Sequence, residues 1–114
     1  MSNASRRQVV RGSNTEHRRT HRRAVGLRAR LRKPGTTQFD VDVVDLSTAG
    51  FRTETGAILH PGATVWLTMP GLAALEAVVA WRDRYRYGCA FRVPLHQAVL
   101  DHIVARNWSG KAMG

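Results

Sequence analysis

Apolar and polar residues alternate along most of the chain from position 25 onward. Residues 25–32 (VGLRARLR) place apolar side chains at every second position and arginines between them. A second alternating stretch, Gln38 to Asp45, follows the turn residues 33–37 (KPGTT). A period of two indicates a half-buried strand, and a short Pro-Gly turn between two such strands is typical of a hairpin. These residues therefore predict an antiparallel β-hairpin.

The register of this hairpin follows from its two faces. Pairing Leu31 with Phe39 places apolar residues opposite one another on the inner face and arginines opposite aspartates on the outer face. A slip by one residue would place arginines opposite valines, so both faces favour the same pairing. Continued along the hairpin, this register sets Asp45 across from Val25. The arginines just before Val25 should therefore lie near the residues that follow Asp45.

The rest of the chain predicts four more strands and one helix. The strands are expected at Phe51 to Thr55, Thr64 to Met69, Leu75 to Trp81, and Tyr85 to Val93. Between Leu95 and Asn107, apolar residues recur at a spacing of four, as Val99 and Ile103 do, which indicates a short amphipathic helix. We therefore expect an all-β fold with a C-terminal helix, in which six antiparallel strands close into a small barrel without exposed edges.

The positive charge lies almost entirely in the first part of the chain. Residues 1–32 contain ten arginines and one acidic residue, Glu16, and so carry +9 of the formal charge of +10. Such a segment usually faces an anion, and arginine, unlike lysine, binds phosphate and guanine edges with paired donors. The sequence therefore favours a phosphorylated or nucleic-acid ligand.

Several other classes of protein are disfavoured by composition. The 114 residues suffice for one domain. The single cysteine, Cys89, forms no internal disulfide and supplies no thiolate zinc cluster, so we expect no metal and no cofactor. We find no catalytic residues, because no nucleophile-and-base pair or paired carboxylates stand out, and the protein is not expected to be an enzyme. No apolar run is long enough to span a bilayer, so we expect a cytoplasmic protein without membrane contact.

Two short motifs point to a binding site. Residues 18–23 (RRTHRR) contain two overlapping RxxxR pairs, Arg18 with Arg22 and Arg19 with Arg23. The second motif, at residues 45–50 (DLSTAG), is a strand end followed by a polar turn. A tight connection with Gly50 at positive φ would account for this second pattern without any ligand. Neither motif is specific alone, but the predicted hairpin brings the two together.

The two motifs in this order and spacing resemble the PilZ domain family. The signature of that family is an RxxxR motif, a first strand after about three residues, a hairpin, and then D/NxSxxG. The later stretches VVAWR (residues 78–82) and YGCAF (residues 87–91) look like the closing strand pair of a PilZ barrel. The resemblance covers roughly residues 16–106. The PilZ domain is expected at residues 17–107. Residues 1–16 lack periodicity and are rich in Ser, Asn and Arg, so we expect a flexible basic arm, with residues 1–4 read as a remnant of an expression vector, and residues 108–114 form a C-terminal tail.

The resemblance implies a six-stranded PilZ-type β-barrel that binds cyclic di-GMP and passes the second-messenger level to a protein partner, which the sequence does not identify. The implied ligand-binding residues are Arg18, Arg22, Asp45, Ser47 and Gly50. Additional contacts are considered for Arg19, Arg23, Trp81 and Arg82. The pair Arg18 and Arg22 is preferred, because Arg22 stands three residues before Val25. For Trp81 a core position, on the same face as Val79, competes with a place near the ligand.

The chemistry of cyclic di-GMP suits these residues. Arginine forks match guanine O6 and N7 and also bind phosphate, and the Asp45 carboxylate would accept hydrogen bonds from guanine N1 and N2. Ser47 would donate to phosphate or accept from a base, and Gly50 would let the backbone approach closely. Two alternatives stay open: a degenerate PilZ domain that acts only as a protein-interaction adaptor, and a small-barrel nucleic-acid-binding protein. The absence of a stripe of exposed aromatic residues on the predicted sheet argues against specific nucleic-acid binding.

Overall fold

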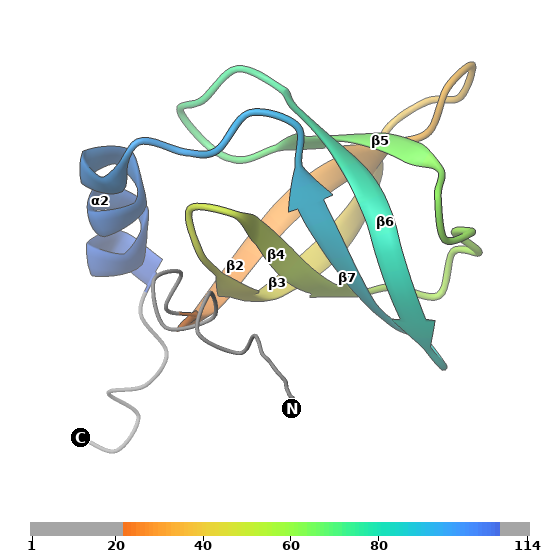
Figure 1. Ribbon diagram of the computed structural model, residues 1–114, viewed down its shortest axis with the longest axis horizontal. Helices are drawn as coiled ribbons and strands as arrows, with labels where there is room; N and C mark the ends of the chain where they lie inside the picture. The colour runs from red at the N-terminus through yellow and green to blue at the C-terminus, as the bar shows by residue number, and fades with distance from the viewer. Residues whose placement is uncertain (1–21, 108–114) are drawn as a thin grey trace, which may run out of the picture.

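The computed structural model describes residues 22–107, which form a β-barrel with one helix at its end (Figure 1). The alternating stretches of the sequence become strands, and the stretch with a spacing of four becomes the helix. In chain order the elements are β2 (Arg23–Arg32), β3 (Phe39–Leu46), β4 (Gly50–Glu54), β5 (Thr64–Thr68), β6 (Leu75–Asp83), β7 (Arg86–Phe91) and α2 (Gln97–Asn107). The predicted fold class, six antiparallel strands and a C-terminal helix, is confirmed.

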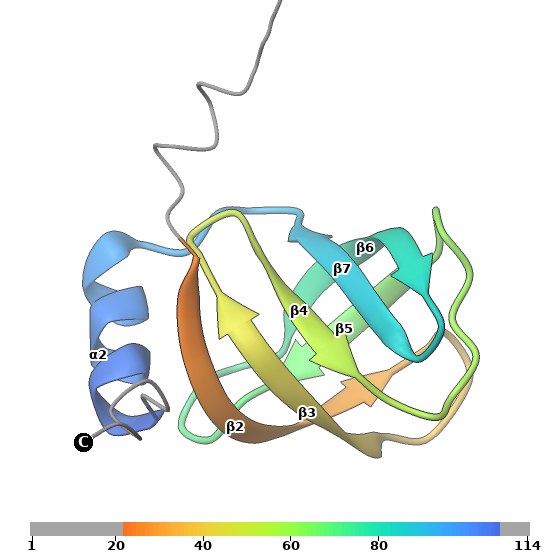
Figure 2. The same ribbon diagram turned by 90° about the horizontal axis from the view of Figure 1, so that it is seen from below.

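The strands close in the order β2-β3-β4-β7-β6-β5, and every neighbouring pair is antiparallel. Closure leaves no strand of the barrel without a partner on either side. Because β7 inserts between β4 and β6, the motif turn that links β3 to β4 lies next to the last strand of the chain. Figure 2 shows this turn beside the start of β2.

The predicted register of the first hairpin is correct over most of its length. Leu31 pairs with Phe39, and the same register continues as far as Leu27 and Val43. The expectation that Asp45 lies opposite Val25 is wrong, because Asp45 pairs with Ala24. The register shifts by one residue between Leu27 and Ala24, where two residues of β2 stand against one of β3, as in a β-bulge.

The core fills the inside of the barrel and continues under α2. Alternate residues of every strand point inward, and Leu31, Val43, Val65 and Leu67 are completely buried. Each fully buried side chain of this size contributes about 1.5–3 kcal/mol of transfer free energy. Helix α2 covers one end of the barrel with a buried stripe, which consists of Leu100, Ile103 and Val104.

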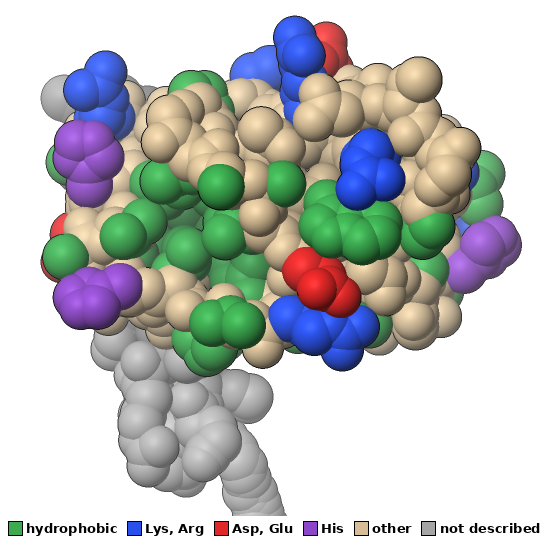
Figure 3. Space-filling model, turned by 90° about the horizontal axis from the view of Figure 1, so that it is seen from above, with side chains coloured by type: hydrophobic (Ala, Val, Ile, Leu, Met, Phe, Trp, Pro, Cys, Tyr) green, Lys and Arg blue, Asp and Glu red, His purple; other side chains and the backbone are tan. Residues whose placement is uncertain are grey.

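The cover over the α2 end is incomplete. On the face seen in Figure 3, hydrophobic side chains gather in a hollow near α2. Four residues from the β5–β6 connection, β6 and the helix region are only partly buried while packing against the core: Leu72, Leu75, Leu95 and Val99. No helix within residues 22–107 has the length and apolar character needed to cross a membrane.

Candidate functional site

Five residues form a continuous row across five strands of the barrel wall. Ala24 pairs with Asp45, Asp45 with Arg52, Arg52 with Gly88, and Gly88 with Trp81. Register shifts flank this row on three of the strand pairs, β2–β3, β3–β4 and β6–β7. Bulges re-aim side chains and often occur next to binding sites. Here they place residues that simple alternation assigns to the interior on the outer surface.

Trp81 is the clearest case of this displacement. By alternation it would share the inner face with Ala77 and Val79, both of which are fully buried. The shift between Val79 and Trp81 removes it from that face, so the indole is only half-buried and lies over Gly88 on the outside. The expected core position is therefore wrong. Trp81 instead lines a hollow together with the residues of the D/NxSxxG motif.

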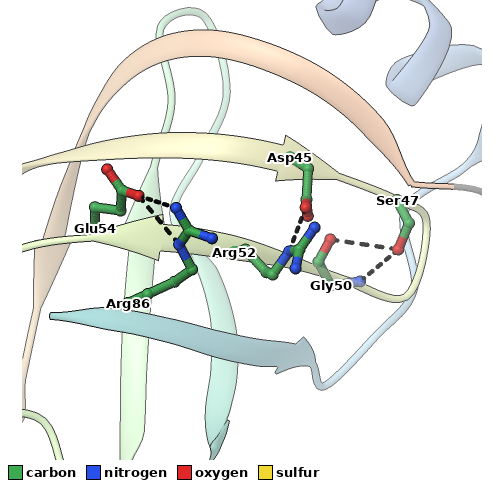
Figure 4. Close-up of polar contacts among 6 residues, drawn as sticks. All are labelled: Asp45, Ser47, Gly50, Arg52, Glu54 and Arg86. Carbon is green, nitrogen blue, oxygen red and sulfur yellow. Dashed lines mark hydrogen bonds and ion pairs between the residues drawn. The ribbon is translucent and has the colours of Figure 1, made fainter. Parts of the chain in front are cut away.

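Asp45 is displaced in the same way. Its neighbour Leu46 takes the inner position and is completely buried, while the Asp45 carboxylate binds the guanidinium of Arg52 on β4 (Figure 4). The Asp45 side chain is only 8% exposed, against 34% for Arg52. A buried carboxylate requires such a partner, because desolvating an unpaired charge is costly. Arg52 engages one carboxylate oxygen through Nε; within residues 22–107 the other carboxylate oxygen accepts no hydrogen bond.

Ser47 builds the turn that carries the motif. Its hydroxyl oxygen accepts hydrogen bonds from the amides of Ala49 (3.1 Å) and Gly50 (3.2 Å), and the hydroxyl donates to the Gly50 carbonyl (3.4 Å). The Ser47 amide also donates to that carbonyl, at 2.9 Å. These contacts use the full hydrogen-bonding capacity of the hydroxyl. In this structure Ser47 therefore shapes the turn and has no free donor for a phosphate.

Gly50 is required for a reason other than a positive φ. The tight turn expected here is present, but Gly50 is absent from the glycines with positive φ, so the expectation of a positive φ at this position is wrong. A Cβ at Gly50 would instead lie 2.1 Å from the carbonyl oxygen of Cys89 on β7. The close backbone approach expected from the motif is thus an approach to a neighbouring strand.

The motif residues meet in one hollow of about 280 Å³, called the motif hollow below. It is lined by Arg22, Asp45, Ser47, Ala49, Gly50, Phe51, Arg52, Ala80, Trp81, Gly88, Cys89 and Ala90. Two guanidinium groups, one carboxylate and an indole thus border a space whose other lining residues are mostly small. Such a space suits a flat, polar ring that carries negative charge nearby.

The other arginines predicted for the site are distributed differently. Arg23 lies outside the motif hollow, where its guanidinium is 3.8 Å from the Asp101 carboxylate on α2. Arg82 also lies outside it, over the Tyr87 ring at 5.8 Å, and donates from Nε to the Arg84 carbonyl at 2.9 Å. Arg18 and Arg19 fall outside the described residues. Of the two overlapping pairs, the one that contains Arg22 is therefore the one whose second member lines the hollow.

Cys89 is one of the residues that line the motif hollow, but only 5% of it is exposed. Burial raises the pKa of its thiol to about 12, because the thiolate is poorly solvated there. The thiol is therefore protonated at neutral pH and is a poor nucleophile or metal ligand. Within residues 22–107, no three His, Cys, Asp or Glu side chains gather as a metal site would require.

Sequence reasoning missed two residues of this site, Arg52 and Gly88. Both residues lie in predicted strands, but their contacts follow only from which strands pair with one another. Arg52 stands between Phe51 and Thr53, two inward-facing residues of a predicted strand, so alternation places it on the outer face without saying what it contacts. The role of Gly88 follows from the pairing of β7 with β6, which places it opposite Trp81.

Comparisons with known proteins agree with the barrel fold. The family model described as PilZ domain matches residues 16–106. Among solved structures, the PilZ domain of CeSA from a cellulose-synthesizing bacterium superposes with a TM-score of 0.55 and 18% sequence identity. The superposition covers 75% of this chain and 93% of that domain, and at this identity it shows the fold alone. No protein of curated function matches the chain.

Proposed function

Since the chain belongs to the PilZ domain family, whose members are binding and adaptor domains and include cyclic di-GMP receptors, we propose that it binds cyclic di-GMP in the motif hollow. The observation that carries this proposal is the convergence of Arg22, Asp45 and Trp81 on one hollow. Arg22 directly precedes β2, while Asp45 and Trp81 come from β3 and β6, where bulges turn them outward. A merely structural turn would not require these three side chains to border one hollow.

Each wall of the motif hollow has a task in recognising guanine. The indole of Trp81 offers a flat surface for stacking on a base. The Asp45 oxygen that Arg52 leaves free accepts from guanine N1 and N2, while Arg52 holds the carboxylate in place. Arg22 grips phosphate or the O6 and N7 edge. Ser47 acts indirectly, by holding the turn that positions Asp45 and Gly50.

The decisive experiment is a calorimetric titration with cyclic di-GMP and cyclic di-AMP at about 50 and 200 mM salt. We expect cyclic di-GMP to bind at both salt concentrations and cyclic di-AMP to bind at least about 100-fold more weakly, because a site built for particular hydrogen bonds rejects the wrong base. Asp45→Ala serves as the control and should lose the discrimination. Equal affinity for the two dinucleotides would contradict the proposal.

The same titration separates the two alternatives. A short single-stranded oligonucleotide should bind the basic segment through counterion release, and its affinity should collapse between the two salt concentrations. Oligonucleotide binding that outlasts both dinucleotides at high salt would favour a nucleic-acid-binding protein. Absence of all nucleotide binding from the folded chain would favour the protein-interaction adaptor.

A further inference from the structure

A second hollow lies beside the motif hollow, and the two share Arg22, Asp45 and Arg52. This arginine hollow has a volume of about 340 Å³ and is completed by Ala24, Val44 and Arg86. The Asp45–Arg52 ion pair borders both spaces: Trp81 and the motif turn line only the first, and Arg86 lines only the second. Figure 4 shows Arg86 and Glu54 next to Arg52 along the same strands.

The arginine hollow keeps an excess of positive charge after its ion pairs are counted. Arg86 donates to Glu54 from Nε at 3.0 Å and from Nη2 at 2.5 Å, and this carboxylate raises the pKa of Arg86. Arg52 is engaged through Nε alone, and within residues 22–107 Arg22 forms no ion pair. Three guanidinium groups therefore stand against the carboxylates of Asp45 and Glu54. Terminal nitrogens of Arg52 and the Nη1 of Arg86 remain without a hydrogen-bond acceptor in the described residues.

We propose that Arg22, Arg52 and Arg86 form a phosphate-binding subsite that takes a phosphodiester group of the nucleotide whose base lies in the motif hollow. This inference rests on the proposed function. Guanidinium groups bind phosphate oxygens with paired donors, and converging arginines from different strands are pre-organised for that task. A cyclic dinucleotide joins its bases and phosphates in one compact ring. It can therefore place a base beside Trp81 and a phosphate on the other side of the Asp45–Arg52 pair.

The test compares two arginines in matched surroundings. Arg86 and Arg92 are about equally exposed, at 49% and 52%, and each binds a glutamate on a neighbouring strand, Glu54 or Glu76. Only Arg86 lines the arginine hollow. By calorimetry, Arg86→Ala should weaken cyclic di-GMP binding about fivefold to tenfold, as expected for one partly exposed charged contact, and Arg92→Ala should stay within about twofold of wild type. Equal effects of the two substitutions, with wild type binding normally, would overturn the subsite and leave the proposed function standing.

A gain of affinity provides the complementary test. Glu54→Ala removes the competing carboxylate and should tighten cyclic di-GMP binding severalfold, which general damage to the fold would not do. Glu76→Ala is its matched control and should have no effect. If Glu54→Ala weakens cyclic di-GMP binding or leaves it unchanged, the proposed subsite is wrong.

If wild type fails to bind cyclic di-GMP, the proposed function fails, and a titration with inorganic pyrophosphate tests the phosphate subsite by itself. Weaker pyrophosphate binding by Arg86→Ala than by Arg92→Ala would support it, and equal binding would overturn it.

Discussion

The indole of Trp81 lies over Gly88, in the space that a Cβ on residue 88 would occupy. That Cβ would be 2.1 Å from the indole Nε1. The missing side chain on β7 is thus what lets the tryptophan lie directly against the barrel wall, in the same hollow as Arg52 and the motif turn. The bulge turns Trp81 outward, and Gly88 determines how close to the wall it rests.

Gly88→Ala should move the indole away from the wall. Because the obstacle is a side chain that can rotate, we expect a modest loss of stability, about 1 kcal/mol, but a clear loss of cyclic di-GMP affinity. Urea unfolding and calorimetry measure the two effects, and Trp81→Ala is the comparison for affinity. Unchanged affinity in Gly88→Ala would show that the close approach of the indole to the wall does not matter for binding.

Gly50→Ala should behave differently, because its obstacle is backbone. The new Cβ would meet the Cys89 carbonyl oxygen at 2.1 Å, and neither strand can retreat without breaking the β4–β7 pairing. We expect a loss of about 2–4 kcal/mol in the free energy of unfolding, larger than for Gly88→Ala. Thermal and urea unfolding of the two variants side by side test this order.

Arg22→Ala and Arg23→Ala should separate the two overlapping arginine pairs. Arg22 lines both hollows, so its removal should weaken cyclic di-GMP binding about tenfold or more with little change in melting temperature. Arg23 faces Asp101 on α2, so its removal should leave affinity nearly unchanged. The reverse order of affinities would assign the site to the pair formed by Arg19 and Arg23.

Arg52→Ala should destabilise the fold more than removal of both charges does. It leaves the Asp45 carboxylate buried without its partner, at a cost of about 1–3 kcal/mol. In the double variant Asp45→Asn with Arg52→Ala, that unpaired charge is gone and part of the stability should return. A double-mutant cycle in urea measures the coupling. Additive effects would mean that the ion pair has no role in holding Asp45.

The buried thiol of Cys89 should lower the free energy of unfolding at alkaline pH. The folded thiol has its pKa raised to about 12, whereas the unfolded thiol ionises near 9.0. Between these values the unfolded state releases a proton that the folded state keeps, so the free energy of unfolding falls as pH rises above about 9. The decline should be steeper in wild type than in Cys89→Ala, by at most about 1.4 kcal/mol per pH unit. Urea unfolding at pH 8, 9 and 10 gives the two slopes; parallel slopes would refute the buried, protonated thiol.

Much of the fold could be predicted from the sequence because local physics specifies it. Alternation from Val25 to Leu31 and from Phe39 to Val43 determined which residues face the core. The match of arginines to aspartates across the hairpin determined the register, and Leu31 indeed pairs with Phe39. The spacing of four between apolar residues, as in Val99 and Ile103, likewise predicted α2, whose buried stripe includes Ile103. These features depend on residues that are close in the sequence or joined by one turn.

The surroundings of the candidate site were decided only by the tertiary structure. Alternation assigns Asp45 and Trp81 to the interior, and bulges that alternation cannot reveal turn them outward. Arg52, Gly88 and Arg86 acquired their places because β7 inserts between β4 and β6, a pairing between segments far apart in the chain. The alternation of apolar and polar residues indicates which face of a strand each residue occupies, but it does not indicate which strand is the neighbour. The partner of Asp45 and the floor under Trp81 are properties of barrel closure, which no single stretch of sequence contains.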